Sequence, residues 1–183
     1  MHVVAAPDKF RGTASALEVA TAVERAVAEH GGTTAVLPMA DGGEGTLEAL
    51  GGSNQTSLVT GPLGGLVEAP WQLTGTTAII EMAKASGLIT IGGPEFNEVL
   101  DATSAGTGEL ILSAVEHGAT RIIVGLGGSA STDGGLGAIE AMGSPARYRG
   151  IEILVACDVN TRFVDSAKMF SPQKGATRAE VEM

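Results

Sequence analysis

Residues 38–46, PMADGGEGT, follow an apolar run at 33–37 and precede a helical pattern that begins near Glu44. This order predicts a strand, a glycine-rich loop and a helix. The chain opens in the same way, because an apolar run at 2–6 is followed by a helical pattern in which Ser15 and Glu18 have capping-box spacing. Strand, helix, strand and helix in succession predict the start of a doubly wound parallel sheet.

The rest of the chain predicts a second unit. From residue 56, the β-rich pieces SLVT, LVEAPWQL and TAIIEMA alternate with turns, and a helix is expected at 104–117 before a buried strand at 121–124. We therefore expect an α/β fold with a boundary near Gly61. Residues 1–60 would form the N-terminal part of a Rossmann-like three-layer domain, and residues 61–183 a second, mixed α/β domain.

Both domains are expected to be incomplete. Two strands and two helices cannot close a doubly wound layer. Thr177 and Glu180 also have capping-box spacing just before the last residue, which predicts a helix that is cut off. We therefore expect the chain to be the N-terminal part of a longer protein; the alternative is a natural C-terminus that frays.

Composition limits the class of protein. Hydrophobic residues make up 44% of the chain and aromatic residues 3%, so the core must consist mainly of aliphatic side chains, joined by Trp71, Met39 and Met82. A net charge of −10 without a basic stripe argues against nucleic-acid binding. No apolar run reaches the ~20 residues that cross a membrane. The single cysteine, Cys157, leaves no intramolecular disulfide, which favours the cytoplasm.

Three loops share one design: an apolar strand ends in glycines mixed with hydroxyls and acids, and a helix then begins. They are APDKFRGTAS (6–15), MADGGEGT (39–46) and GLGGSASTDGG (125–135). Glycine lets backbone N–H groups approach a phosphate, which the positive end of the helix also attracts. A neighbouring carboxylate repels phosphate unless it holds a cation or accepts a proton, so Mg²⁺ is expected. For any one loop, the alternative is a plain turn before an acidic helix start.

Motifs along nearly the whole chain resemble the type I glycerate kinase family. In order, they are APDKFRGT (6–13), ADGGEGT (40–46), TGPLG (60–64), IEMAKASGL (80–88), GTGELI (106–111), GLGGSASTDGG (125–135), VACDV (155–159) and PQKGAT (172–177). The resemblance implies a two-domain enzyme of about twice this length, with its site in the cleft between the domains. Its ligands would be ATP, Mg²⁺ and D-glycerate, whose 2- or 3-hydroxyl receives the γ-phosphate. A homodimer stays open.

The chain departs from the usual family pattern in four places. Lys9 stands where the family more often has Ser, and Arg11 where it has Lys. The segment GSPARYRG (143–150) is shorter than usual, and NTRF (160–163) replaces an Asn-Pro-Leu pattern. Two rivals to a glycerate kinase therefore remain: a kinase of another small hydroxy acid, and a fragment that binds a ligand without catalysis.

Phosphoryl transfer needs alignment, charge neutralisation and a group that accepts the hydroxyl proton. For catalysis we select Asp41, as general base or metal ligand, with Asp8 and Asp158 as further acids. For substrate binding we select the charged, glycine and hydroxyl residues of two loops and one helix start: Lys9, Arg11, Gly42, Gly43, Glu44, Thr103, Ser104 and Thr107. Each has a plain alternative as a surface charge, turn former or helix cap.

For the nucleotide we select the glycines, hydroxyls and charges of the third loop together with one lysine near the end of the chain: Gly127, Gly128, Ser129, Thr132, Asp133 and Lys174. Asp41 and Asp133 are the expected Mg²⁺ ligands, because carboxylate oxygens are the ligands that Mg²⁺ prefers. For Ser129 and Thr132, the alternative is hydrogen bonding within a glycine-rich turn.

Overall fold

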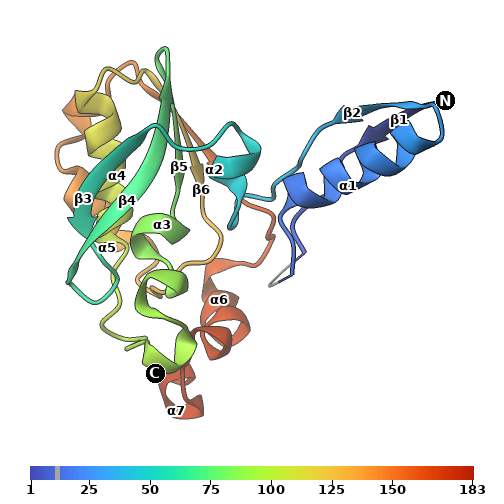
Figure 1. The fold of residues 1–183 in the computed structure, drawn as a ribbon. Helices are drawn as coiled ribbons and strands as arrows, with labels where there is room; N and C mark the ends of the chain where they lie inside the picture. Colours follow the sequence, from blue (N-terminus) through green and yellow to red (C-terminus); the bar gives the residue numbers. More distant parts are fainter. Residues whose placement is uncertain (11–12) are drawn as a thin grey trace.

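A computed structural model describes residues 1–10 and 13–183, so the expectation for Arg11 lies outside the described residues. The N-terminal arm, residues 1–36, contains β1 (His2–Ala5), α1 (Ala16–Glu29) and β2 (Thr33–Val36). The two strands pair in parallel, and the arm projects from the rest of the molecule (Figure 1). The capping box of Ser15 and Glu18 is confirmed, since each side chain accepts a hydrogen bond from the other's backbone N–H.

The body, residues 55–183, is built on a five-stranded sheet in the order β3-β4-β5-β6-β7, and residues 37–54 connect it to the arm. Pairing is antiparallel from β3 to β5 and parallel from β5 to β7. The strands are β3 (Gln55–Thr60), β4 (Leu66–Thr74), β5 (Thr77–Glu81), β6 (Arg121–Gly125) and β7 (Glu152–Ala156). The mixed α/β fold class is thus confirmed.

Helices and short 3₁₀ segments precede, connect and follow these strands. The helices are α2 (Thr46–Ala49), α3 (Ala83–Ser86), α4 (Ala105–Glu116), α5 (Leu136–Met142), α6 (Phe163–Phe170) and α7 (Arg178–Val181). The 3₁₀ segments are η1 (Leu88–Ile91), η2 (Pro94–Phe96), η3 (Pro145–Tyr148) and η4 (Pro172–Lys174). The helix expected at 104–117 is confirmed as α4, as is the second capping box, from Thr177 and Glu180.

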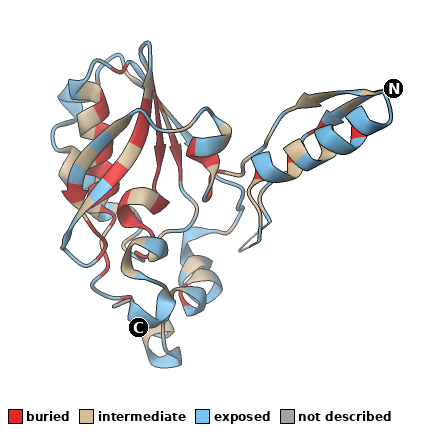
Figure 2. Cartoon of the chain, viewed as in Figure 1, coloured by how far each residue is buried: buried red, intermediate tan, exposed pale blue. Residues whose placement is uncertain are grey.

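The hydrophobic core lies in the body, where buried residues concentrate (Figure 2). It brings Val59, Ala69, Trp71, Ile80, Leu110 and Ile122 together between β3–β6 and α4. Trp71 and Met82 are buried as expected, but the expectation for Met39 is wrong, because its side chain is 54% exposed. Met39 follows β2, and the thin arm has no second layer to cover it.

The division seen in the structure falls before β3 rather than at Gly61. β3 pairs with β4 along residues 55–60, so it belongs to the body. The β-rich composition that begins at residue 56 marks the interior of a strand rather than a linker. Of the residues that the structure describes, no helix is long and apolar enough to cross a membrane.

Candidate functional site

A cavity of about 760 Å³ is lined by both the arm and the body. Its walls include residues that follow the carboxyl ends of four strands: Lys9 after β1, Asp41 after β2, Gly127 after β6 and Asp158 after β7. Open α/β sheets bind ligands at this end of their strands. The three glycine-rich loops, far apart in the sequence, therefore meet at one cavity.

Glycines let the loop after β2 pack backbone against backbone with the body. Gly127 N–H donates to the Gly42 carbonyl at 2.9 Å. A Cβ atom on Gly127 would collide with the Gly43 backbone, and one on Gly42 with the Ala156 carbonyl. Gly42 also has φ of 89°, a left-handed conformation that favours glycine. These glycines are needed for close approach whether or not they contact a ligand.

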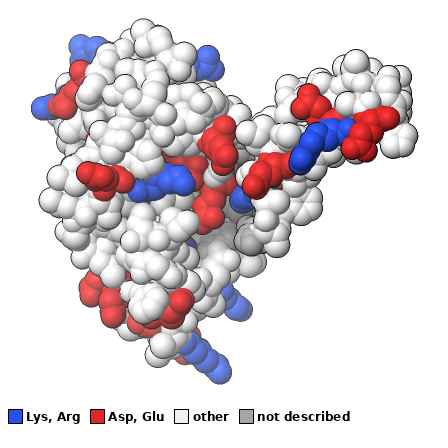
Figure 3. Space-filling view, in the orientation of Figure 1, with Lys and Arg blue, Asp and Glu red and all other residues white. Residues whose placement is uncertain are grey.

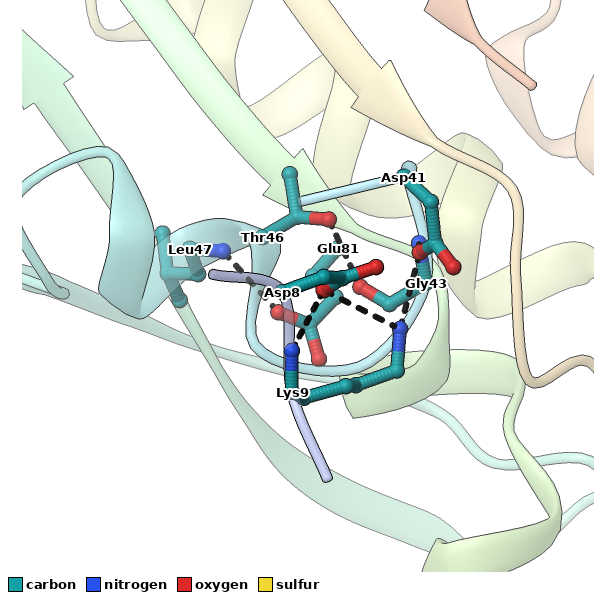
Figure 4. A network of polar contacts seen from close by, with 7 residues as sticks. All are labelled: Asp8, Lys9, Asp41, Gly43, Thr46, Leu47 and Glu81. Carbon is teal, nitrogen blue, oxygen red and sulfur yellow. Dashed lines mark hydrogen bonds and ion pairs between the residues drawn. The ribbon is translucent and has the colours of Figure 1, made fainter. Parts of the chain in front are cut away.

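Asp41 is held at the cavity wall by two hydrogen bonds to one of its oxygens. Lys9 Nζ and Gly43 N–H both donate to Asp41 Oδ1, each at 2.8 Å (Figure 4). The hydrogen bond from Lys9 lowers the pKa of Asp41 below its ordinary value, more than partial burial raises it. Asp41 is therefore ionised at neutral pH.

Asp8 lies beside this pair but not on the main cavity. Its Oδ1 accepts the Lys9 backbone N–H at 2.6 Å, and Lys9 Nζ lies 4.0 Å away. Asp8 instead lines a small adjoining cavity of about 30 Å³, together with Pro38 and Met39. The structure thus places Asp41 and Asp158 on the main cavity and Asp8 behind Lys9.

Negative charge predominates around the cavity. Glu18, Asp41, Glu44 and Asp158 line it, and among the lining residues that the structure describes, Lys9 is the only cation. Figure 3 shows acidic side chains gathered where the arm meets the body. An anionic ligand would be repelled here unless backbone N–H groups or a cation compensated the carboxylates.

Two glycines of the 125–135 loop line the cavity, while its hydroxyl side chains make hydrogen bonds elsewhere. Gly127 and Gly128 line the cavity, whereas Ser129 Oγ accepts a hydrogen bond from Lys174 Nζ at 2.7 Å. Thr132 Oγ1 donates to the Val99 carbonyl at 2.9 Å. These hydroxyls and the Lys174 ammonium therefore hold the loop in shape rather than face the cavity.

Asp133 has an anchoring position. Its carboxylate accepts hydrogen bonds from Ser104 N–H and Oγ and from the Gly135 and Gly137 N–H groups, at 2.7–3.2 Å. Burial by itself raises the pKa of Asp133, but these bonds together outweigh it and lower the pKa. Burial lowers the pKa of Lys174, and the nearby Asp133 opposes that shift.

The hydroxyl residues expected at the start of α4 are not among the cavity-lining residues. Ser104 is fully buried and Thr107 is 2% exposed; Thr107 Oγ1 donates to Ser86 Oγ at 2.9 Å. Thr103 Oγ1 accepts the Ala105 N–H at 3.1 Å. These contacts are internal, and the N-cap Ser104 makes no side-chain capping hydrogen bond within α4.

The structure adds cavity residues that the sequence analysis did not select, among them Phe10, Glu18, Leu88 and Gln173. It also reveals Glu81, a fully buried acid at the end of β5. An acid at the carboxyl end of an apolar strand is a signal that the motif IEMAKASGL contained. Gln173 had no such signal, since only the fold brings η4 to the cavity.

The fold and the site together define an α/β protein with a ligand cavity at the carboxyl ends of its strands. The model of the Glycerate kinase family matches residues 3–145. The chain belongs to the glycerate kinase family.

Individual relatives agree with this assignment. Glycerate 2-kinase of Escherichia coli K12 is 40% identical over 220 aligned residues, covering 99% of this chain and 58% of the relative. Glycerate kinase of Bacillus subtilis 168 is 38% identical, with 97% and 56% covered. A crystal structure from Salmonella typhimurium LT2, provisionally named glycerate kinase 2, superposes with a TM-score of 0.82 at 39% identity, covering 100% of this chain and 60% of that one. The chain thus spans little more than half the length of these relatives.

Proposed function

We propose that the protein transfers the γ-phosphate of ATP to a hydroxyl of D-glycerate. The observation that carries the proposal is the meeting of three glycine-rich loops at one acidic cavity in a chain of this family. Phosphoryl transfer depends mainly on aligning the substrates and compensating their charge. Loop N–H groups beside carboxylates can do both.

Asp41 is the residue we assign to the acceptor hydroxyl. Both hydrogen bonds described for its carboxylate use Oδ1, so we assign the other oxygen, Oδ2, to the hydroxyl. An ionised carboxylate with a lowered pKa is a weak base, but a loose transition state needs the hydroxyl oriented more than it needs full proton removal beforehand. Lys9 would keep Asp41 ionised and add positive charge for an anionic substrate.

The donor set of the cavity fits Mg²⁺. Asp41 and Asp158 offer carboxylate oxygens in an open cavity, and Mg²⁺ usually takes one or two carboxylates, with phosphate oxygens and water completing its coordination. Among the described residues there is no group of three or more His, Cys, Asp or Glu arranged to hold a metal, so phosphate oxygens would have to complete the site. When bound, Mg²⁺ neutralises charge on the phosphates.

The second Mg²⁺ ligand is better sought in Asp158 than in Asp133. The Asp133 carboxylate already accepts hydrogen bonds from Ser104, Gly135 and Gly137 and is absent from the cavity lining. We therefore assign Asp133 to holding the loop, and the Gly127 and Gly128 backbone to the phosphates. Lys174, with Ser129, belongs to the same support.

Two finer points complete the proposal. The name of the Escherichia coli relative, glycerate 2-kinase, favours the 2-hydroxyl as the acceptor. The single cysteine favours a reducing, cytoplasmic setting.

An assay of ADP release tests the proposal on the chain as it stands. D-glycerate, L-glycerate and other small hydroxy acids are each supplied with ATP and Mg²⁺, and the product is identified by ³¹P NMR. Release of ADP with D-glycerate and formation of 2-phosphoglycerate are expected. Turnover with a different hydroxy acid alone would support the rival kinase.

A ligand-binding role without catalysis is the second candidate, because the chain spans little more than half of its relatives and Phe10, on the cavity wall, is 53% exposed. Calorimetry distinguishes it. Binding of glycerate or nucleotide with no ADP release from any hydroxy acid would support that role and contradict the proposed enzyme.

A further inference from the structure

Glu81 is a fully buried acid that lies outside the cavity lining. It is the last residue of β5, and its side chain is 0% exposed. Its Oε2 accepts the Leu47 N–H at 3.0 Å, while Oε1 has no hydrogen-bond partner among the residues that the structure describes and lies 3.7 Å from Lys84 Nζ. Burying a carboxylate with one oxygen unsatisfied destabilises a fold, so its position calls for an explanation.

The Leu47 N–H belongs to the first turn of α2, a helix that cannot cap itself. α2 has four residues, and a helix of that length is not stable by itself. Its N-cap is Gly45, with φ of 90° and no side chain to accept a hydrogen bond. Glu81 supplies the missing acceptor from the neighbouring strand, and its negative charge suits a helix N-terminus.

Hydrogen bonds continue from this point to Asp41 through residues 41–46, which we call the acid loop. Thr46 Oγ1, next to Leu47, donates to the Gly43 carbonyl at 2.7 Å, and Gly43 N–H donates to Asp41 Oδ1 at 2.8 Å. Figure 4 shows this series from Glu81 to Asp41 and Lys9. Thr46 is 3% exposed, so its bond is shielded from water.

Glu81 is also attached firmly on its other side. It pairs with Gly125 at the end of the β5–β6 ladder, and Met82 N–H donates to the Gly125 carbonyl at 2.9 Å. Gly125 begins the 125–135 loop, which supplies Gly127 and Gly128 to the cavity. Glu81 is therefore bonded to α2, which follows the acid loop, and paired with Gly125, where the 125–135 loop begins.

We propose that Glu81 is a positioning residue: it caps α2 from β5 and thereby holds the acid loop, and Asp41 with it, in register with the 125–135 loop. Glu81 does not touch the cavity, so it acts through the loop and not on the ligand. Its effect on the loop is independent of the reaction, whereas its effect on turnover rests on the proposed function.

Hydrogen exchange tests the effect on the loop without any activity. In Glu81→Gln, amides of residues 42–49 are expected to exchange at least about tenfold faster than in the wild type, because a neutral amide caps a helix less well than a carboxylate. Once corrected for any change in global stability, exchange of the β4 and β6 amides should match the wild type. Unchanged exchange at 42–49 would overturn the proposal.

Glu109→Gln is the matched control. Glu109 also accepts a backbone N–H from another element, that of Thr60 at 2.7 Å, together with the Thr60 hydroxyl at 2.7 Å. It lies on α4, away from the acid loop. This variant should lose stability without faster exchange at 42–49. Equal acceleration in both variants would mean that Glu81 contributes only general stability.

Turnover provides the second test. Glu81→Gln is expected to lower kcat about tenfold with little change in KM, and to have no further effect in an Asp41→Asn background, because both changes act on one unit. Fully additive losses would contradict action through Asp41.

Thr46→Val is the second variant, for the case in which Glu81→Gln fails to fold. It breaks the series one bond further along and leaves Glu81 in place. It should accelerate exchange at Gly43 and lower kcat in the same way, and wild-type behaviour in both would overturn the proposal. If the wild-type chain releases no ADP, the proposed function fails, and the exchange measurement alone decides the role of Glu81.

Discussion

The N-terminal arm and the body are both α/β structures, but they differ in how much they bury. The core cluster draws its residues from the body, where Trp71, Ile80, Leu110 and Ile122 are fully buried. In the arm, one helix packs on two strands, and Val4 in β1 remains 58% exposed. A two-stranded sheet with one helix lacks the second covering layer that makes the body's strands stable.

The cavity lies where these two regions meet. The body supplies Gly127, Gly128 and Asp158, while the arm supplies Lys9. Asp41, on the connection between them, is bonded to Lys9 on one side and linked through the acid loop to Glu81 on the other. The position of Asp41 therefore depends on contacts from both regions, and the arm's Lys9 also lowers its pKa.

The largest expected effect is on stability and belongs to the body. Ile122→Ala removes a fully buried side chain from the core and is expected to lower the free energy of unfolding by about 2–5 kcal/mol. Urea unfolding followed by Trp71 fluorescence measures it. Val4→Ala in the arm, as control, should cost under about 1 kcal/mol, because Val4 is largely exposed. Equal losses would show that the arm is as well packed as the body.

The next effect concerns the junction of the two regions. Asp41→Asn is expected to lower kcat by about 10²-fold, near 2.7 kcal/mol, because it removes the charge that orients the acceptor hydroxyl. The melting temperature should change little. Steady-state kinetics measure it, with Asp101→Asn, an exposed acid away from the cavity, as the control that keeps wild-type turnover. Near-normal turnover in Asp41→Asn would make Asp41 structural.

The third change pushes two cavity loops apart by adding one methyl group to a glycine. Gly127→Ala places a Cβ atom against the Gly43 backbone, so the acid loop and the 125–135 loop must move apart. About a tenfold loss in affinity for the nucleotide is expected, which calorimetry measures. Gly65→Ala is the matched control: its Cβ meets nothing within 4 Å and its φ is not positive, so affinity should be unchanged. Equal affinity in both variants would mean that the loop spacing is not critical.

The smallest effect concerns the charge environment that the arm provides. The pKa of Asp41 is lowered in the folded state, so ionised Asp41 stabilises the fold. This contribution is fully present above pH 3.8, the ordinary pKa of an aspartate, and is lost as the pH falls through the folded pKa. Lys9→Met removes the largest cause of the shift. The pKa of Asp41 should then rise toward 3.8, as measured by carboxyl ¹³C NMR titration. An unchanged pKa would show that Gly43 N–H is sufficient.

Local features of the fold were predictable from the sequence. The capping boxes at Ser15 and Thr177 depend on residues three apart, and both form as expected. The helix at 105–116 followed from its apolar spacing and from Gly118, which has φ of 90°. These signals lie within one element, so they need no knowledge of what packs against it.

Non-local features were not predictable in the same way. Residues 55–60 were expected in the first domain, but their pairing with β4 places β3 in the body. Met39 looked like a core residue because its side chain is apolar, but whether an apolar side chain is covered depends on the other elements of the fold. Glu81 became significant only once α2 was seen to begin at its carboxylate.

By itself, the sequence determined several of the strands and helices and that acidic, glycine-rich loops follow the strands. Those properties depend on short-range spacing, backbone sterics and hydrogen bonding between near neighbours. Only the tertiary structure decided which of two chemically identical acids faces the cavity. Asp158 lines it, whereas Asp133 is bonded to the start of α4, because the direction of a side chain depends on the partners that the whole fold brings to it.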